Sequence, residues 1–355
     1  MFEIPLLLIL IVLVALVFDF TNGAHDCANA IATVVSTKVV TPRFAVGMAA
    51  ALNLAGALLG TEVAKTLGAG LVLPEVVQGS HILVLAALLG AIFWNCLTWY
   101  FGIPSSSSHA LIGGLVGAAL AHAGPDALNF AGIVNKVLLP LVLSPLAGFG
   151  VGFLIMWLIY WIFARVMRSK VNRIFRKMQL VSAAFMATSH GLNDAQKTMG
   201  IITLTLIAVG EQASGTGPQF WVVLICGLAI ALGTYMGGWR VIRTLGKGLT
   251  EVTPLQGFAS EAASTTTILV SSHLGFALST TQVCSGSIIG CGLGKKGNAV
   301  NWKVAGKMLI AWLITFPAAG LVGALACAIA KTGIYGTLAV AVIFVVLAFI
   351  IFRLS

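Results

Sequence analysis

Two polar stretches interrupt the apolar sequence, and each carries an aspartate three residues after a glycine. Residues 19–33 read DFTNGAHDCANAIAT, and residues 189–200 read SHGLNDAQKTMG. Their Gly-x-x-Asp patterns place Asp26 and Asp194 168 positions apart (194 − 26 = 168). Ionisable groups at membrane depth are costly, and by default they mark a substrate or ion pathway. Polar, glycine-marked helix breaks at matching places in two halves predict the binding site of a transporter.

A hydroxyl-rich pattern also occurs twice. Residues 106–109 (SSSH) match residues 279–282 (STTQ), an offset of 173 positions (279 − 106 = 173), and Gly102 and Gly275 keep that offset. Hydroxyls and free backbone N–H groups donate to oxyanions without adding charge, and helix N-termini favour anions. Two ionised aspartates would repel an oxyanion, so a cation or proton must accompany it. These residues therefore predict symport of an oxyanion.

The composition places such a site inside a membrane. The sequence is 59% hydrophobic and only 8% charged, which excludes a soluble globular domain. Its apolar runs are long and continuous, which favours helices over a transmembrane barrel. The run 4–18 lacks a basic region and a cleavage site, so we interpret it as a retained span rather than a signal peptide. The six cysteines form no CxxC pair, and we expect buried thiols rather than a metal site or disulfides.

The elements that must position the polar residues are long helices and two hairpins. Pro104 prevents one continuous helix through residues 82–121, so this segment is predicted to enter and leave the membrane from one face. Residues 255–293 repeat that plan. Backbone at a hairpin tip is tolerated at membrane depth where it lines a cavity. The other predicted spans, the first and fourth of them broken at the polar motifs, are 4–36, 44–60, 137–163, 180–209, 220–238, 304–329 and 334–352.

The basic residues indicate orientation rather than nucleic-acid binding. The net charge of +10 is dispersed over short loops, and residues 165–177 hold the strongest cluster. Under the positive-inside rule these loops are cytoplasmic, and each half then crosses the membrane an odd number of times. The prediction is an all-α polytopic membrane protein of two inverted-topology repeats, each with a broken helix and a re-entrant helical hairpin. Its parts are the first repeat (1–164), a connector (165–177), the second repeat (178–331) and a further C-terminal helix (332–355).

The motifs NGAHDCANA and SHGLNDAQK, the two hydroxyl-rich tips and the stretch QGFASE together resemble the inorganic phosphate transporter (PiT) family. The resemblance covers nearly the whole chain, including the basic connector. It implies a secondary-active importer of inorganic phosphate in the cell inner (plasma) membrane, working by alternating access. It also implies a homodimer in the lipid bilayer, with no cofactor, no resident metal and no nucleic-acid partner.

By motif position, the resemblance assigns roles to residues of both halves. Phosphate is placed among Asp26, Asn29, Ser106, Ser107, Ser108, Asp194, Lys197, Ser279, Thr280 and Thr281. The coupling ion is assigned to His25, Asp26, Asn193, Asp194 and Lys197. Further candidates to line the cavity are Asn22, Asn95, His109, Gln256, Glu261 and Gln282.

Two positions depart from the sodium-coupled pattern of that family, which looks like Gly-x-Asn-Asp-x-x-Asn in both halves. His25 precedes the first aspartate, and Lys197 stands where the second asparagine would be. Both changes resemble the bacterial branch that moves phosphate, often as a metal–phosphate complex, with protons. A lysine ammonium beside Asp194 would occupy the place of a bound cation, and histidine titrates near neutral pH. We therefore expect proton coupling rather than sodium coupling. Gln282 cannot titrate, which weakens any proton role for the second tip.

Three other functions fit parts of the pattern. A sulfate permease of the same fold would use the same donors, but phosphate can donate a proton to a carboxylate and sulfate at neutral pH cannot. A passive anion channel would need no coupling ion. An intramembrane hydrolase would use Ser108 and His109, but adjacent helical residues point apart and no orienting acid is evident. Phosphate symport uses all of the repeated residues.

Overall fold

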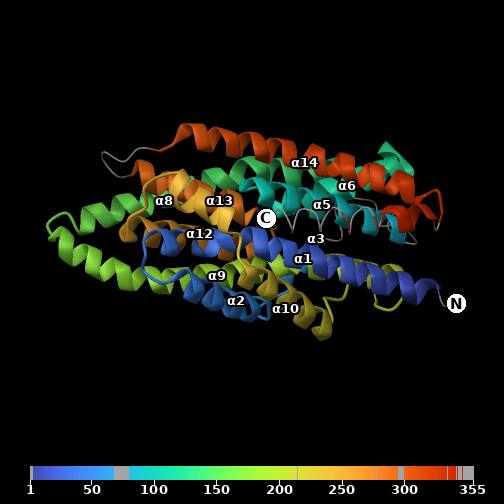
Figure 1. The fold of residues 1–355 in the computed structure, drawn as a ribbon, viewed down its shortest axis with the longest axis horizontal. Coiled ribbons are helices and arrows are strands. Elements are labelled where there is room, and N and C mark those ends of the chain that lie inside the picture. The colour runs from blue at the N-terminus through green and yellow to red at the C-terminus, as the bar shows by residue number, and fades with distance from the viewer. Residues whose placement is uncertain are drawn as a thin grey trace.

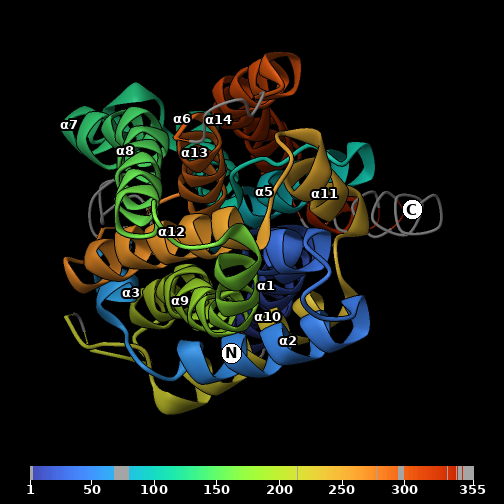
Figure 2. The ribbon, with the colours of Figure 1, turned by 90° about the vertical axis from the view of Figure 1, so that its left-hand side faces the viewer.

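The computed structural model describes residues 3–67, 80–213, 215–276, 278–294, 300–333, 335–340, 342 and 346. Within them the regular structure is helical, apart from one isolated bridge between Thr250 and Val300. Most helices lie lengthwise along the longest axis (Figure 1), and Figure 2 views the same bundle from one end. The longer helices are α1 (Glu3–Ser36), α2 (Pro42–Ala57), α5 (His81–Phe101), α6 (Ser107–Ala123), α8 (Leu139–Ile162), α9 (Arg168–Ala208), α10 (Phe220–Met236), α12 (Pro254–His273), α13 (Thr280–Leu293) and α14 (Trp302–Ala330). The short ones are α3 (Glu62–Leu67), η1 (Pro125–Ala127), α7 (Phe130–Ile133), η2 (Val134–Leu138), α11 (Trp239–Arg243) and η3 (Thr244–Gly248).

Four of the described helices are long and apolar enough to cross a membrane: α1, α5, α8 and α14. A fifth crossing is available if α10 and the segment Trp239–Gly248, which bend by 63° at their junction, count as one span. Helix α5 is largely enclosed, whereas α8 and α14 turn large apolar side chains such as Trp157 and Leu313 outward. In a bilayer such faces contact lipid. The enclosed helices are therefore the ones that can carry polar groups.

The expected helix breaks at the two polar motifs are wrong. Helices α1 and α9 run without interruption through Gly23 and Gly191. The glycines serve close packing instead: a Cβ on Gly23 would lie 2.3 Å from the Ile230 carbonyl oxygen of α10. A Cβ on Gly191 would lie 2.1 Å from the Asn53 carbonyl oxygen of α2. Small residues let membrane helices approach this closely, which brings the polar motifs into the centre of the bundle.

The two helical hairpins form at the expected places. Helix α5 ends at Gly102 (φ +64°), and α12 is followed by Gly275 (φ +74°), a left-handed conformation that glycine adopts without a steric cost. In each hairpin a serine then caps the returning helix. Ser106 Oγ accepts from the His109 N–H, and Ser279 Oγ accepts from the Gln282 N–H. A side-chain cap of this kind fixes where the second arm begins.

The second arm of each hairpin packs on a long helix from the other half of the chain. Helix α6 lies against α14, where a Cβ on Gly113 would be 2.4 Å from the Phe316 carbonyl oxygen. Helix α13 lies against α8, where a Cβ on Gly286 would be 2.2 Å from the Pro145 carbonyl oxygen. The two glycines differ by 173 positions (286 − 113 = 173) and the two carbonyls by 171 (316 − 145 = 171). Corresponding contacts thus recur in the two halves.

Some expected segments differ in extent or cannot be followed. Helix α9 begins at Arg168, so most of the basic connector 165–177 belongs to that helix. The predicted exit of the second hairpin at residues 295 and 296 lies outside the described residues. So does most of the predicted last span, residues 334–352, and with it most of the C-terminal part 332–355.

Candidate functional site

The Asp26 carboxylate lies on α1 and receives donors from both hairpin tips. Its side chain is buried, Ser107 Oγ donates to Oδ2 (2.8 Å), and Thr281 Oγ1 donates to Oδ1 (3.1 Å). His25 Nδ1 lies 2.6 Å from Oδ1, so one aspartate gathers three side chains. Because Ser107 and Thr281 belong to opposite halves of the chain, Asp26 marks the meeting point of the two tips.

The Asp194 carboxylate of α9 is equally buried and carries more positive charge around it. Lys197 Nζ donates to Oδ1 at 2.5 Å, and His190 Nε2 lies 3.3 Å from Oδ2. Thr280 Oγ1 of the second hairpin donates to Oδ2 (3.2 Å). Lys197 has no exposed surface. A buried ammonium is stable only with a partner of opposite charge, so Lys197 and Asp194 form a structural pair.

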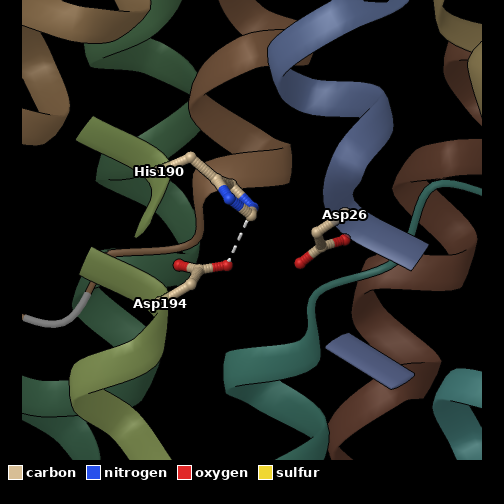
Figure 3. A group of neighbouring side chains, drawn as sticks. All are labelled: Asp26, His190 and Asp194. Carbon is tan, nitrogen blue, oxygen red and sulfur yellow. Dashed lines mark ion pairs between the residues drawn. The ribbon is translucent and has the colours of Figure 1, made fainter. Parts of the chain in front are cut away.

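The two carboxylates converge. One ligand atom from each of Asp26, His190 and Asp194 lies within 4.8 Å of the other two, and Figure 3 shows the three side chains pointing toward one another from α1 and α9. A nitrogen and two carboxylate oxygens at this spacing are a donor set that a divalent cation accepts. His190 was not predicted. Its position four residues before Asp194, on the same helix face, was the available signal.

The hydroxyls of the two tips divide into two roles. Ser107, Thr280 and Thr281 reach the carboxylates directly, and Asn29 Nδ2 donates to both threonine hydroxyls at 3.3 and 3.0 Å. The other predicted hydroxyls are engaged elsewhere. Ser106 and Ser279 serve as helix caps, and Ser108 Oγ donates to the Leu278 carbonyl of the opposite tip (3.4 Å).

Both tips also direct helix N-termini toward the carboxylates. Helix α6 starts at Ser107 and α13 at Thr280, the same residues whose side chains contact Asp26 and Asp194. The first N–H groups of a helix have no partner within it, and the helix dipole is positive there. An oxyanion between the tips would thus meet two helix N-termini, three hydroxyls and the Asn29 amide. The carboxylates oppose it unless a cation or proton lies between.

Two residues assigned to the coupling ion connect the site to its surroundings. His25 Nε2 faces the first hairpin, 3.2 Å from the Ile103 carbonyl oxygen and 3.3 Å from Thr98 Oγ1. Asn193 Nδ2 donates to Ser272 Oγ on α12 (2.8 Å). His25 therefore bridges Asp26 and the first hairpin, whereas Asn193 ties α9 to the second hairpin.

The candidates for the cavity lie in several places. Glu261 accepts from Thr33 (2.5 Å), Gln179 (3.2 Å) and Ser182, in a separate buried cluster. Gln256 forms a capping box with Thr253 at the start of α12. His109 is buried at the start of α6. The side chains of Asn22, Asn95 and Gln282 are buried, and none of their polar atoms has a hydrogen-bond partner.

A cavity of about 720 Å³ lies beside the site, between the α2–α3 turn, α9 and the end of α12. Its polar lining includes Glu62, Gln196 and Ser272. The carboxylates of Asp26 and Asp194 are not part of that lining. Ser272 connects the two regions, since it lines the cavity and accepts the hydrogen bond from Asn193, the residue before Asp194.

Comparison with known proteins agrees with this arrangement. A profile of the phosphate transporter family matches residues 22–323. The probable low-affinity inorganic phosphate transporter of Mycobacterium leprae is 50% identical over 319 residues, which is 90% of this chain and 77% of that protein. Its counterpart in Bacillus subtilis is 45% identical over 321 residues, 90% of this chain and 96% of that protein.

A solved structure, "The sodium-dependent phosphate transporter", has the same fold, with a TM-score of 0.81 at 24% identity. The match covers 92% of this chain and 99% of that one. The family profile spans both motif aspartates and both hairpin tips. The chain therefore belongs to the phosphate transporter family and is a multi-pass membrane transporter of phosphate rather than an enzyme.

Proposed function

We propose that the chain is a secondary-active symporter that imports inorganic phosphate across the inner (plasma) membrane, coupled to protons. One observation carries the proposal: carboxylates from two long helices and hydroxyls from both hairpin tips meet at one buried point. Such a point is where opposing halves can hold an ion between them. The relatives described as probable low-affinity inorganic phosphate transporters support the choice of substrate.

The architecture that would carry this function is a pair of inverted-topology repeats, 1–164 and 178–331, joined by the connector 165–177. The reciprocal packing of α1 on α10 and of α9 on α2 supports the repeat, as does the crosswise packing of the hairpins. Each hairpin is re-entrant, with its polar tip at membrane depth. Rocking of one half against the other alternates access to the site.

Phosphate binds between the tips, held by Ser107, Thr280, Thr281 and Asn29 and by the helix N-termini beside them. Ser106, Ser108 and Ser279 contribute by fixing the tips. Asp26 and Asp194 accept hydrogen bonds from a protonated phosphate or hold the cation that accompanies it. Lys197 neutralises Asp194, which lowers the repulsion that a bound anion would meet.

The coupling ion is a proton rather than sodium. The ammonium of Lys197 lies where a second cation would sit, and His25 places a titratable ring on Asp26. Asn193 completes this set from α9. The convergence of Asp26, His190 and Asp194 also favours transport of phosphate together with a divalent metal, which is cargo here and not a resident cofactor.

The polar residues around this point line the permeation path. Asn22, Asn95 and Gln282 are buried without hydrogen-bond partners and are suited to a passing ion. His109 and Gln256 position the hairpins, and Glu261 lies in a polar cluster on the cytoplasmic side of the second hairpin. The functional unit is a homodimer, which cross-linking in native membranes would test by the appearance or absence of a species of twice the mass.

The test is uptake of labelled phosphate into proteoliposomes that contain the purified protein, with proton and sodium gradients imposed separately. We expect uptake to follow the inward proton gradient and to survive excess sulfate. Loss of uptake to sulfate would identify a sulfate permease. Uptake that ignores both gradients would identify a passive channel, and either result overturns phosphate symport.

A further inference from the structure

Among the described residues, the buried carboxylate of Asp19 has no part in the mechanism above. Asp19 lies on α1, two turns before Asp26, and has no exposed surface. Neither of its oxygens has a hydrogen-bond partner. A carboxylate in this setting is expensive to bury unless a positive charge joins it. Asp19 thus needs a proton or a cation beside it to be stable where it is buried.

Two neighbouring side chains are also buried without a hydrogen-bond partner. Asn22 follows Asp19 by three residues on the same face of α1, and both polar atoms of its buried amide lack partners. The Thr198 hydroxyl of α9 lies close to the Asp19 carboxylate, but the two are not in hydrogen-bond geometry. Thr198 is also fully buried. A carboxylate and an amide on α1 and a hydroxyl on the adjoining α9 are therefore buried without a well-formed hydrogen bond.

The charged residues around Asp19 indicate the charge of the ligand that would bind there. Asp19 interacts electrostatically with Asp194 and Lys197 on α9, and Cys226 on α10 is the other titratable neighbour. Asp194 already has Lys197 as its partner at 2.5 Å, so Asp19 contributes one unmatched negative charge. One monovalent cation balances it, whereas a divalent ion would leave an excess positive charge. All-oxygen donor sets suit hard cations such as Na⁺, and a proton satisfies a single carboxylate.

We propose that Asp19, Asn22 and Thr198 form a binding site for one monovalent coupling cation, separate from the phosphate site. The proposal rests on the proposed symport and names the place of one coupling ion. A cation here repels the Lys197 ammonium and holds it on Asp194. Asp194 is then neutralised, and phosphate can approach it. Without that cation, Asp19 adds negative charge beside Asp194 and opposes the approach of phosphate. Cation binding therefore raises phosphate affinity, and phosphate raises cation affinity by the same factor.

The coupling ratio is the decisive readout because it does not depend on how fast a variant turns over. The number of cations moved per phosphate would be measured in proteoliposomes, from the cation and phosphate gradients at which the net flux of phosphate stops. One arm uses a pH gradient without sodium, and the other uses a sodium gradient at equal pH. We expect Asp19→Asn to move one cation fewer per phosphate than the wild type. The arm in which the loss appears identifies the cation as H⁺ or Na⁺.

Asp126→Asn, at an exposed position, is the matched control and should keep the wild-type ratio. A wild-type ratio in Asp19→Asn overturns the proposal. If the wild-type protein moves no phosphate at all, the symport proposal itself fails. That result differs from a wild-type ratio in Asp19→Asn, which overturns only the proposed cation site.

A second variant covers the case in which Asp19→Asn does not fold. Thr198→Val removes one ligand at nearly constant volume, and we expect about a tenfold rise in the half-saturating concentration of the cation. Thr205→Val on the same helix is the control, since the Thr205 hydroxyl bonds only to the Ile201 carbonyl of the preceding turn. Equal cation dependence in the two valine variants would overturn the assignment.

Discussion

At the scale of single residues, the proposed site centres on the carboxylates of Asp26 and Asp194, which have different partners. Asp26 is surrounded mainly by hydroxyls and one imidazole, whereas Asp194 has an ammonium and an imidazole. At the low dielectric of a membrane interior, such differences in neighbouring charge strongly change the electrostatic energy of a carboxylate. Asp194 is therefore suited to stay neutralised by the protein itself. Asp26 is suited to bind the transported coupling ion.

Replacing either aspartate by its amide tests this division of roles. Asp26→Asn and Asp194→Asn should each abolish coupled uptake, a loss of about a hundredfold or more, as expected when a hydrogen bond to a buried charge worth ~3 kcal/mol is removed. Expression should be retained because the shape is unchanged. Uptake by reconstituted protein is the measurement, with Asp126→Asn as control. Near-normal transport in either amide variant would remove the role of that aspartate.

Lys197 offers a second test at the residue scale. Lys197→Asn removes the ammonium beside Asp194 and leaves a space with an amide ligand, so we expect weaker proton dependence or a newly acquired sodium dependence. Uptake at a series of external sodium concentrations measures this. Lys65→Asn is the control, because that lysine forms an exposed ion pair with Glu62, a kind of pair that adds little. If both variants keep the wild-type ion dependence, Lys197 does not replace a cation.

At the scale of the helices, much could be predicted from the sequence. The long apolar runs gave α2, α5, α8, α10 and α14 within a few residues, and Pro104 located the first hairpin. The breaks expected at Gly23 and Gly191 did not occur. Glycine lowers the helix propensity of a segment, but the sequence alone does not say which helix passes nearby. Contacts with Ile230 and Asn53, more than 130 residues away in each case, decided the outcome.

The site residues were foreseeable only in part for the same reason. The repeated motifs predicted that both tips and both aspartates belong to the site. A repeat can be recognised in the sequence without knowing which residues lie close together in space. The surroundings of Asp19, and the approach of His190 to Asp26, depend on the register between α1 and α9, which no local pattern fixes. Likewise Ser106 and Ser279 resemble ligands in the sequence, yet each serves as a helix cap.

The close packing of the hairpins can be tested with a single methyl group. A Cβ on Gly117 of α6 would lie 1.9 Å from the Gly320 carbonyl oxygen of α14. Gly117→Ala should therefore destabilise the protein by ~1–3 kcal/mol through overpacking. Gly306→Ala on α14 is the control, since nothing lies within 4 Å of its Cβ, and it should unfold at an equal or higher temperature. Equal melting temperatures of the two variants in detergent would mean that α6 and α14 are not in contact there.

At the scale of the whole molecule, the two halves are interleaved rather than side by side. Helix α6 of the first half packs on α14, and α13 of the second half packs on α8. Movement of one hairpin relative to the other must therefore change contacts in both halves at once. Because the tips supply donors to both carboxylates, such movement would expose or close the site as a unit.

The proposed inverted arrangement predicts opposite sidedness for equivalent positions. Asp126 follows the first hairpin and Lys303 follows the second, and both are exposed. We expect Asp126→Cys to react with an impermeant thiol reagent on intact cells, and Lys303→Cys to react only after permeabilisation. The six native cysteines are buried, so the background is low. Labelling of both positions from the same side would contradict the inversion.

The most direct test is an experimentally determined structure of the protein saturated with phosphate. We predict tetrahedral density between the hairpin tips, within hydrogen-bond distance of Ser107 and Thr281 and next to Asp26 and Asp194. Phosphate bound at any other place, or a separation of the two aspartates that leaves no shared pocket, would contradict the proposed site.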